Sequence, residues 1–599
     1  MNLSLDALHP LTLTLLKKRG IPDEEIEDFL NPSYEKHIGD PFGIHGVPAA
    51  VDRILLAMKR GEKICVYSDY DCDGIPGGVL LRTFFDDIGY PVEIYVPHRH
   101  NEGYGVHIHA VDALKERGVT LIITVDLAIT NIEEIAYAKS VGVDFIVTDH
   151  HLPITKEMSD DREQSADSSL TPNSQPLTIQ VVPDAVAVIN SKQDVCTYDD
   201  DMLCGCAVAW KLACALLSRL RVENINDVVY EKVKTLPEGF EKWMLDLVGI
   251  STVADMVPLV KENRALAHYG LKVLRKTKRP GLLHIFNEQR MKLENLTEED
   301  IAFTVAPRIN AAGRMGAPIQ AHHMLYERDR ERAEQYARDL ELLNTERKAG
   351  VKDIVSTLAF DHSAYKNDVV VVGDVSWGPG ILGLIAQNII DETGKPTFVW
   401  GQGGDGREET SDNRQMQVAK GSCRSRGDVH VVELMARCRE MFPGVMIASG
   451  GHEQAGGFSC DLERIDELSH ALNEAYKHVT LRKLGSQDIV ADAELSMDDI
   501  HEVTYKAIAP LAPFGEGNPK PIFMFTNVTP LATKRFGKKN EHFEVIYPTS
   551  KGGRIKAIQF FVKGDTEEKA AKPHTLLAHL EKSFFAGKTE LRLRIVEVR

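Results

Sequence analysis

Residues 63–78 read KICVYSDYDCDGIPGG, an apolar run that passes directly into three alternating aspartates and then into glycines. Two later stretches repeat this order, because residues 121–126 read LIITVD and residues 145–151 read FIVTDHH. Uninterrupted apolar runs of this length are typical of strands in a parallel sheet that is buried on both faces. Helical patterns separate the runs, at 78–87 and 132–139. The sequence therefore predicts an α/β fold built from strand–helix–strand units.

The acidic and histidine side chains that follow these strands are predicted to meet at one edge of the sheet. Right-handed crossovers place the carboxyl ends of parallel strands together. Many carboxylates share a crevice only if cations neutralise them, and oxygen ligands with one or two imidazoles favour Mn²⁺ or Mg²⁺. We therefore expect a two-metal centre for phosphoryl transfer or hydrolysis, with the candidate ligands Asp69, Asp71, Asp73, Asp126, His150 and Asp255.

The residues around this centre carry further expectations. His150 and His151 point to different sides, so one can bind metal while the other faces the substrate as donor or acid. Asp255 lies in the apolar stretch 247–258, where a carboxylate is costly unless it is paired or metal-bound, which favours a bridging or closing ligand. An exposed acidic turn at 69–73 and a helix cap at Asp126 are the simpler alternatives.

Two basic segments are predicted to bind phosphate. Residues 306–314, APRINAAGR, place two arginines and an amide among small residues, and guanidinium groups bind phosphate bidentately. Residues 421–425, GSCRS, and 450–452, GGH, predict a second cradle, in a cleft between two α/β domains. Interdomain salt bridges are the alternative for the first two arginines. The candidate substrate-binding residues are Arg99, Tyr104, Asn310, Arg314, Ser422, Arg424, Ser425, Gly450, Gly451 and His452.

The 599 residues are too many for one hydrophobic core, so several domains are expected. The stretch from 320 to about 358 is charged and free of Pro and Gly until Gly350, which predicts one long helix, either a bridge between domains or a coiled-coil partner site. The expected order is a helical lead-in at 1–45, a catalytic α/β domain at 46–319 with an exposed, mobile insertion at 155–180, a connecting helix at 320–360, a substrate-binding α/β domain at 361–482 and a small β-barrel at 483–599.

Composition excludes some classes of function. A net charge of −18 argues against a protein that coats nucleic acid indiscriminately, although it permits an enzyme with a local basic groove. Nine scattered cysteines fit a reducing cytoplasm, and Cys204 with Cys206 lacks the usual spacing of a zinc site. No segment approaches the roughly 20 apolar residues of a membrane span, and the N-terminus lacks the order of a secretory signal. A cytoplasmic location without membrane contact is expected.

The ordered motifs of this chain resemble those of the RecJ family within the DHH phosphoesterase superfamily. The resemblance spans nearly the whole chain. The segment at 307–316 is particular to the RecJ branch, and the one at 512–519 matches the entry to an oligonucleotide-binding (OB) barrel. The matching stretches are YSDYDCDG (67–74), VPHRHNEGYG (96–105), ITVD (123–126), IVTDHH (146–151), LVGISTVADMVPL (247–259), PRINAAGRMG (307–316), WGPGILG (377–383), KGSCRS (420–425), SGGHEQAGGF (449–458) and APFGEGNP (512–519).

The resemblance implies processive 5′→3′ removal of mononucleotides from single-stranded DNA, using two Mn²⁺ or Mg²⁺ ions, in DNA repair and recombination. Asp71, Asp73, Asp126, His150 and Asp255 match metal ligands of the family, and Asp69 and Asp149 would ligate or orient. Arg99, Arg308, Arg314, Ser422, Arg424 and His452 match groups that hold the DNA backbone or the 5′ phosphate. We expect in-line attack between two cations about 3.5–4 Å apart. The candidate catalytic residues are His151, Asp149 and Arg308.

The barrel is expected to grip single-stranded DNA through bases stacked on aromatic rings and through a basic rim. Phe536 and Phe543 are the stacking candidates, with a place in the barrel core as the alternative. The rim candidates are Lys534, Arg535, Lys538 and Lys539.

The chain departs from the family pattern in three places, one of which is the insertion at 155–180, which has no assigned role. Leu127-Ala128 follows Asp126, where the family has a small residue and glycine, and Gly378 stands where RecJ proteins commonly carry histidine. Two other functions remain alternatives: a DHH enzyme for short oligonucleotides or cyclic dinucleotides, and a non-catalytic DNA-binding relative that has lost metal ligands. A single-strand-binding protein or a helicase is a candidate delivery partner, and a monomer is expected.

Overall fold

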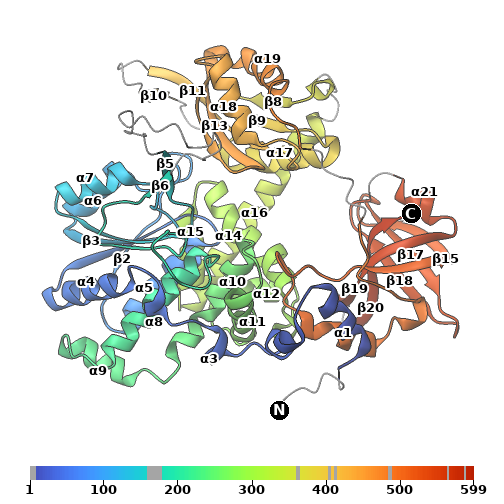
Figure 1. Cartoon of the computed structure of the whole chain (residues 1–599), viewed down its shortest axis with the longest axis horizontal. Coiled ribbons are helices and arrows are strands. Elements are labelled where there is room, and N and C mark those ends of the chain that lie inside the picture. The colour runs from blue at the N-terminus through green and yellow to red at the C-terminus, as the bar shows by residue number, and fades with distance from the viewer. Residues whose placement is uncertain are drawn as a thin grey trace, which may run out of the picture. The chain divides into compact units, whose positions relative to one another are not determined.

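Five parallel strands form the first sheet, in the order β2-β1-β3-β4-β7. Their bounds are Glu93–Tyr95, Lys63–Ser68, Val119–Val125, Asp144–Thr148 and Ala187–Ile189. In this computed structural model, α6 and α7 cover one face of the sheet and α4, α5 and α8 cover the other (Figure 1). These helices span Ile108–Glu116, Ile132–Ser140, Val47–Arg60, Gly74–Asp87 and Gly205–Leu220. The predicted buried parallel sheet is confirmed, because all residues of β1 except Lys63 are buried.

The structure describes residues 8–157, 178–358, 364–402, 407–409, 415–482, 489–562, 565–585 and 588–599. The chain divides into two units, one of residues 1–39, 258–268 and 486–599, the other of residues 40–257 and 269–485. The predicted insertion at 155–180 lies largely outside the described residues. Its flanks, β5 (Ile154–Glu157) and β6 (Thr178–Val181), pair with each other.

Glycines let α5 lie directly against the first sheet. The helix begins at Gly74, four residues before the predicted start. A Cβ at Gly77 would come within 2.5 Å of the Val125 side chain, and one at Gly78 within 2.8 Å of Ser68 Oγ. The close approach offsets the poor helix propensity of glycine and places the helix start at the acidic cluster.

The long helix predicted from 320 to about 358 is wrong in one respect, since it is two helices. α15 ends at Tyr326 and α16 begins at Arg330. Asp329 accepts a hydrogen bond from the backbone N–H of Arg332, so it caps the second helix. No Pro or Gly marks this break.

The α-helices between the first and the second sheet, after α8, are α9 (Asp227–Thr235), α10 (Leu245–Ala254), α11 (Lys261–Leu274), α12 (Pro280–Glu288), α13 (Glu298–Asp300), α14 (Ala306–Arg314), α15 (Pro318–Tyr326) and α16 (Arg330–Leu358).

The second sheet has the order β12-β13-β11-β9-β8, and β10 pairs with β11. Its strands are Met446–Gly451, Ala455–Asp461, Gln415–Arg424, Thr397–Gly401 and Val370–Asp374, with β10 at Arg407–Glu409. The helices are α17 (Pro379–Thr393), α18 (Val431–Met441) and α19 (Ile465–Tyr476). Ser422 pairs with Gly457, which pairs with Gly450. The register therefore brings the two predicted glycine-rich loops into one row of the sheet.

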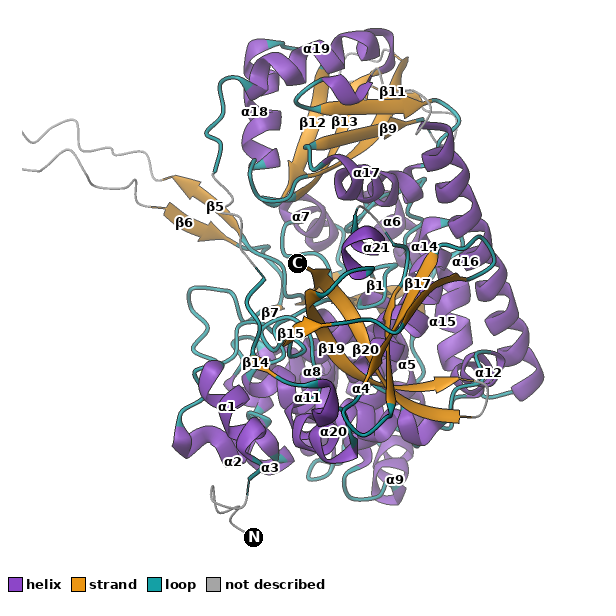
Figure 2. Ribbon diagram, turned by 90° about the vertical axis from the view of Figure 1, so that its right-hand side faces the viewer, coloured by secondary structure: helices purple, strands orange, loops and turns teal. Residues whose placement is uncertain are grey.

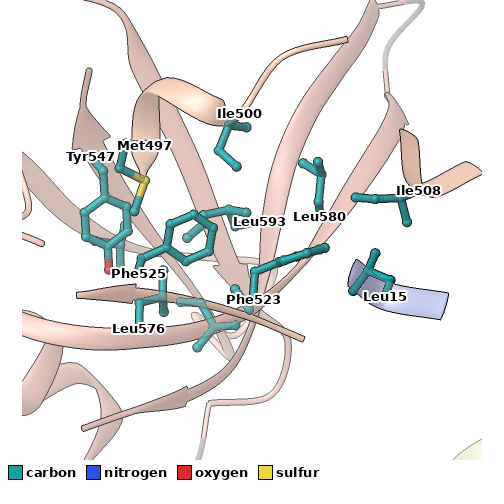
Figure 3. Close-up of a cluster of buried hydrophobic side chains, with 14 of the residues drawn as sticks. Leu15, Met497, Ile500, Ile508, Phe523, Phe525, Tyr547, Leu576, Leu580 and Leu593 are labelled. Carbon is teal, nitrogen blue, oxygen red and sulfur yellow. The ribbon is translucent and has the colours of Figure 1, made fainter. Parts of the chain in front are cut away.

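The C-terminal strands form one seven-stranded sheet, β14-β15-β19-β20-β18-β17-β16. Their bounds are Ala493–Glu494, Phe523–Val528, His574–Phe585, Lys588–Val598, Arg554–Gln559, His542–Pro548 and Ala532–Phe536, and the helices are α20 (Glu502–Ile508) and α21 (Thr566–Ala570). The sheet encloses a cluster that includes Phe523, Phe525 and Tyr547 (Figure 3). Phe543 also lies in this core and is fully buried, so its predicted role in base stacking is wrong.

The N-terminal helices belong to this C-terminal unit rather than forming a separate lead-in. They are α1 (Pro10–Lys18), α2 (Ile26–Leu30) and α3 (Tyr34–His37). Leu15 and Leu16 are buried in the same cluster as Ile508 and Leu580 (Figure 3). Thr12 donates a hydrogen bond to the carbonyl of Ala507. Figure 2 shows the helices in purple beside the strands in orange. No helix among the described residues is long and apolar enough to cross a membrane.

Candidate metal centre and arginine cluster

The acidic loop after β1 is held by its own backbone. Asp71 Oδ1 accepts hydrogen bonds from the N–H groups of Asp73 (2.8 Å) and Gly74 (3.1 Å), which caps α5. A Cβ at Gly74 would lie 2.6 Å from the Asp69 carbonyl oxygen, so only glycine fits there. Asp69 is buried and its Oδ1 has no hydrogen-bond partner. The loop is therefore rigid, and it leaves a carboxylate oxygen available to a ligand.

Asp73 lies at the start of α8. Its two carboxylate oxygens accept hydrogen bonds from the N–H groups of Gly205 (2.6 Å) and Cys206 (2.8 Å), the usual position for an anion at a helix N-terminus. A Cβ at Gly205 would lie 2.6 Å from the Asp126 Cβ, which explains the small residue. Of the candidate metal-binding groups in the described part of the chain, none contains a cysteine.

Asp126 occupies a strained turn at the end of β3. Its φ is 65°, and that of Ala128 is 95°, in the left-handed region that favours glycine. The Ile129 N–H after this turn donates to Asp149 Oδ2 at 2.9 Å. Asp126 Oδ1 is buried without a hydrogen-bond partner. The departure from the family pattern at Leu127-Ala128 therefore changes the strain of this turn while Asp126 keeps an available oxygen.

His150 lies among three carboxylates. Its Nε2 is 3.1 Å from Asp126 Oδ1 and 3.7 Å from oxygens of Asp73 and Asp255, yet neither ring nitrogen makes a hydrogen bond. Burial, together with the neighbouring His151, lowers the pKa of His150 to about 3. A neutral imidazole is the form that binds metal.

His151 points to a different group. Its Nδ1 is 2.8 Å from Asp149 Oδ1 and 3.1 Å from the Tyr104 hydroxyl. Burial opposes protonation, but the hydrogen bond to Asp149 prevails and raises the pKa of His151 to about 9. With Nδ1 bound to Asp149, Nε2 is the atom that can donate to a substrate. Tyr104 also donates to the Asp126 carbonyl at 3.1 Å, so it lies at this centre, and its role in substrate binding stays a prediction.

Asp149 is an anchor for this part of the centre. Its Oδ1 accepts hydrogen bonds from the N–H groups of both His150 and His151, and its Oδ2 binds Ile129. Burial opposes its ionisation, but the hydrogen bond from His151 holds the pKa of Asp149 below its usual range. Asp149 therefore orients both histidines, while its oxygens are already occupied.

The remaining carboxylates repel one another. Burial and the neighbouring Asp71 raise the pKa of Asp73 to about 6, and burial with Asp73 raises that of Asp255 to about 8. The same causes, burial first, raise the pKa values of Asp69 and Asp126. Three groups of side chains each have ligand atoms that lie within 4.8 Å of one another, and the first two groups share no residue. The groups are Asp69, Asp71 and Asp126; Asp73, His150 and Asp255; and Asp126, His150 and His151. This oxygen-rich donor set, with its unpartnered buried atoms, fits divalent cations.

A cluster of arginines adjoins the acidic centre. The Arg99 guanidinium lies 4.9 Å from the centroid of the Tyr70 ring. Arg314 donates to the Gly380 carbonyl at 3.0 Å, and Arg424 donates to Ser422 Oγ at 3.2 Å. Burial, then the nearby charges of Arg99, Arg347 and Arg424, lowers the pKa of Arg314 to about 10. We name Arg99, Arg314, Arg347 and Arg424 the arginine cluster.

The arginine cluster has the properties of an anion site. Within the described ranges, no member forms a salt bridge with a carboxylate. The start of α17 lies against it, since Gly380 in the first turn accepts a hydrogen bond from Arg314 and a Cβ at Gly383, one turn later, would be 2.9 Å from Arg424 Nη2. Gathered guanidinium groups without counter-ions, beside a helix N-terminus, favour a bound phosphate.

Other predicted residues have structural partners. Arg308 donates to Glu341 at 2.5 Å and to the Thr304 carbonyl, the salt-bridge alternative, so the structure places it outside the unpaired cluster. Asn310 accepts from the Cys72 N–H at 3.0 Å and so supports the acidic loop. Ser425 donates to the Val429 carbonyl in a turn.

The predicted loop at 450–452 is exposed. A Cβ at Gly450 would meet no atom within 4 Å, whereas Gly451 has a φ of 141° and lies close to the Ala455 carbonyl. His452 is exposed beside it. Gly378 caps α17, and a Cβ there would also meet open space.

Sequence reasoning missed Arg347, which α16 brings to the arginine cluster. Its neighbours in sequence are charged like the rest of that helix, so no local pattern distinguishes it. The position of one residue on a helix face relative to other elements is a property of the tertiary structure.

Three family models match the chain in order. The DHH family N-terminal domain matches residues 63–236, the DHHA1 domain matches 366–478, and the RecJ OB domain matches 491–597. The last match agrees with the predicted C-terminal barrel.

Curated relatives named single-stranded-DNA-specific exonuclease RecJ are similar over most of the chain. The Bacillus subtilis protein is 31% identical over 542 residues, which are 90% of this chain and 61% of that protein. The Haemophilus influenzae protein is 27% identical over 98% of this chain and 96% of its own length. The chain thus spans less than two thirds of the Bacillus relative.

Solved structures agree with these matches. RecJ from Thermus thermophilus in complex with Mn²⁺ is similar over 99% of this chain and 76% of that chain, with a TM-score of 0.74 and 23% identity. An exonuclease RecJ bound to manganese covers 73% of this chain and 95% of its own, with a TM-score of 0.56 and 27% identity. The predicted family and fold class are confirmed. The chain belongs to the RecJ family of the DHH superfamily.

Proposed function

We propose that this protein is a metal-dependent exonuclease that hydrolyses single-stranded DNA from the 5′ end to 5′-mononucleotides, in DNA repair and recombination. The observation that carries the proposal is the adjoining pair of sites: carboxylates and imidazole with unpartnered buried atoms, beside four arginines without counter-ions. A phosphodiester needs both, because its cleavage adds negative charge at phosphorus and at the leaving oxygen. The names of the curated relatives support the choice of substrate.

The residues of the chain divide the chemistry between them. Divalent cations, when bound by Asp69, Asp71, Asp73, Asp126, His150 and Asp255, supply Lewis-acid stabilisation and lower the pKa of water. His151, held by Asp149, presents Nε2 to the phosphate or to the leaving oxygen. Arg314 and Arg424 neutralise phosphoryl oxygens and hold the strand in register. The 5′→3′ direction and the mononucleotide product rest on the resemblance to the family.

The C-terminal unit carries a ring cluster suited to single-stranded DNA. His542 lies edge-on to Phe560 (5.2 Å between centroids) and Phe561 (4.9 Å), and Phe536 is 5.1 Å from His542. Phe561 is 68% exposed. The guanidinium groups of Arg592 and Arg594 lie over the Phe560 ring at 5.7 and 5.8 Å. Bases stack on exposed aromatic rings with about 1–3 kcal/mol each, so we assign the stacking role to Phe560 and Phe561 in place of Phe543.

The test uses Mn²⁺ and single-stranded DNA labelled at its 3′ end, with the Asp126→Ala variant and an exposed control, Glu331→Gln on α16. We expect the wild type and the control to shorten the strand from the 5′ side, and Asp126→Ala to leave it intact. Survival of long strands with cleavage of dinucleotides would replace this proposal by the short-substrate function. Binding without any turnover would replace it by the non-catalytic function.

The proposal extends to the surroundings of the enzyme. A single-strand-binding protein or a helicase delivers the substrate, and the protein acts as a monomer in the cytoplasm. Sedimentation of the purified chain tests the monomer, and co-purification with each candidate partner tests delivery.

A further inference from the structure

Asn344 and Arg347 occupy adjacent turns of one face of α16. Arg347 Nη2 donates a hydrogen bond to Asn344 Oδ1 at 2.9 Å. Asn344 is fully buried, which is unusual for an amide on a helix whose other side is charged and exposed. The amide therefore fixes the direction in which the guanidinium points.

Both side chains retain a buried donor without an acceptor. Asn344 Nδ2 and Arg347 Nε are shielded from solvent, and neither has a hydrogen-bond partner. Buried polar atoms in folded proteins are nearly always hydrogen-bonded, because an unmade bond costs about 1–3 kcal/mol. Two such donors on consecutive turns indicate a missing group that accepts hydrogen bonds.

The surroundings of these donors favour an anion as that group. Arg347 lies close enough to Arg314 for its positive charge to help lower the pKa of Arg314. Glu341, a carboxylate of the same helix, is bound by Arg308 instead. Burial opposes the charged form of Arg347, and in the described part of the chain no carboxylate pairs with it. A phosphate beside Arg347 would supply an acceptor for its guanidinium and would balance its charge.

We propose that Arg347, which Asn344 orients, binds a phosphate of the DNA strand together with the rest of the arginine cluster. The helix between the two α/β domains is then part of the substrate site as well as a connection. The inference rests on the proposed function, because it takes DNA as the source of the phosphate. That phosphate is either the terminal 5′ group or an internal phosphodiester, and the two sources are separable.

The test measures the binding of a 12-nucleotide oligo(dT) labelled at its 3′ end, by fluorescence anisotropy in EDTA, with a 5′-phosphate or a 5′-hydroxyl. We expect Arg347→Gln to weaken binding of the 5′-phosphorylated strand roughly tenfold, the value of one charge-assisted hydrogen bond. An unchanged affinity for the 5′-hydroxyl strand would assign the terminal phosphate, and equal weakening of both strands would assign an internal one. The matched control is Arg338→Gln, an exposed arginine of the same helix that contacts Gln335.

A second variant separates binding from a purely structural role. Asn344→Asp keeps the shape of the side chain and places a carboxylate beside Arg347, so the two pair internally and the phosphate is displaced. We expect this variant to keep its thermal stability and to bind as weakly as Arg347→Gln. Unchanged affinities in both folded variants, or a loss of stability with unchanged affinity, would overturn the inference.

The measurement also separates this inference from the proposed function. Binding in EDTA needs no turnover. If the wild type binds DNA through Arg347 but does not cleave it with Mn²⁺, the role of Arg347 is supported and the exonuclease activity is contradicted. If the wild type cleaves DNA and Arg347→Gln binds DNA normally, the exonuclease activity is supported and the role of Arg347 is contradicted.

Discussion

The metal centre and the arginine cluster adjoin each other, but they are built in opposite ways. The ligands of the metal centre come mostly from the ends of three neighbouring strands, and backbone N–H groups hold Asp71 and Asp73 in place. The arginines come from a loop, two helices and a strand of the second sheet. Within the described residues, their hydrogen bonds go to neutral acceptors such as the Gly380 carbonyl and the Ser422 hydroxyl. The comparison teaches that a cation site can be assembled by local chain geometry, whereas an anion site here requires distant elements to pack.

The largest expected effect concerns the unbalanced charge of the metal centre. Carboxylates with raised pKa values destabilise the fold near neutral pH until cations neutralise them. Mn²⁺ at a hundred times its dissociation constant should therefore stabilise the unit of residues 40–257 and 269–485 by about 2.7 kcal/mol. Thermal unfolding with Mn²⁺ and with EDTA measures this difference. An Asp126→Asn variant that is stabilised as much as the wild type would contradict the assignment of the ligands.

The next effect separates an unpaired arginine from a paired one. Arg424→Gln removes a guanidinium with no carboxylate partner and should raise the KM for single-stranded DNA by about tenfold to a hundredfold, without loss of stability. Arg308→Gln removes the partner of Glu341 and should lower stability more than substrate affinity. Steady-state kinetics and thermal unfolding of both variants check this. The opposite pattern would return Arg308 to the catalytic role predicted from sequence.

A smaller effect tests the strained turn at Asp126. Ala128 has a φ of 95°, where a side chain costs about 1–2 kcal/mol and glycine costs little. After the extra entropy of unfolded glycine is subtracted, Ala128→Gly should stabilise the protein by about 0.5–1 kcal/mol. Denaturant unfolding measures the gain. Ala136→Gly, at an exposed position in the middle of α7, is the control and should cost about 1 kcal/mol; equal losses in both variants would argue against strain at Ala128.

The smallest effect concerns Glu581, a buried carboxylate that is surrounded by cationic side chains, whereas those of the metal centre lie beside other carboxylates. Burial opposes the ionisation of Glu581, but Lys520, Arg594 and Arg592 hold its pKa below the usual range. Its contribution to stability is therefore present above pH about 4.5 and is lost as pH falls through the lower, folded pKa. We expect acid unfolding of the C-terminal unit to depend less on pH in Glu581→Gln than in the wild type, because the variant lacks this titrating carboxylate. A pH dependence identical to that of the wild type would show that Glu581 is not responsible.

Local signals explain why so much of the metal centre was predictable. An apolar run that ends in Asp126, or in Asp149 and His150, reports both a buried strand and the edge at which it ends. Arg308 and Arg314 lie six residues apart in one motif, yet one pairs with Glu341 and the other joins the arginine cluster. Sequence spacing does not distinguish them, because their environments come from α16 and α17.

The sequence by itself determined the α/β class, the run of strands, and the carboxylates and imidazole at their ends, because strand periodicity and crossover handedness act over short stretches of chain. Only the tertiary structure decided which arginines remain unpaired, that Phe561 is exposed while Phe543 is core, and that the N-terminal helices pack into the C-terminal unit. The break between α15 and α16 also depends on a side-chain cap at Asp329 and not on a Pro or Gly. These outcomes depend on contacts between residues that lie far apart in the chain, or on competition between similar local conformations, and neither leaves a periodic signal in the sequence.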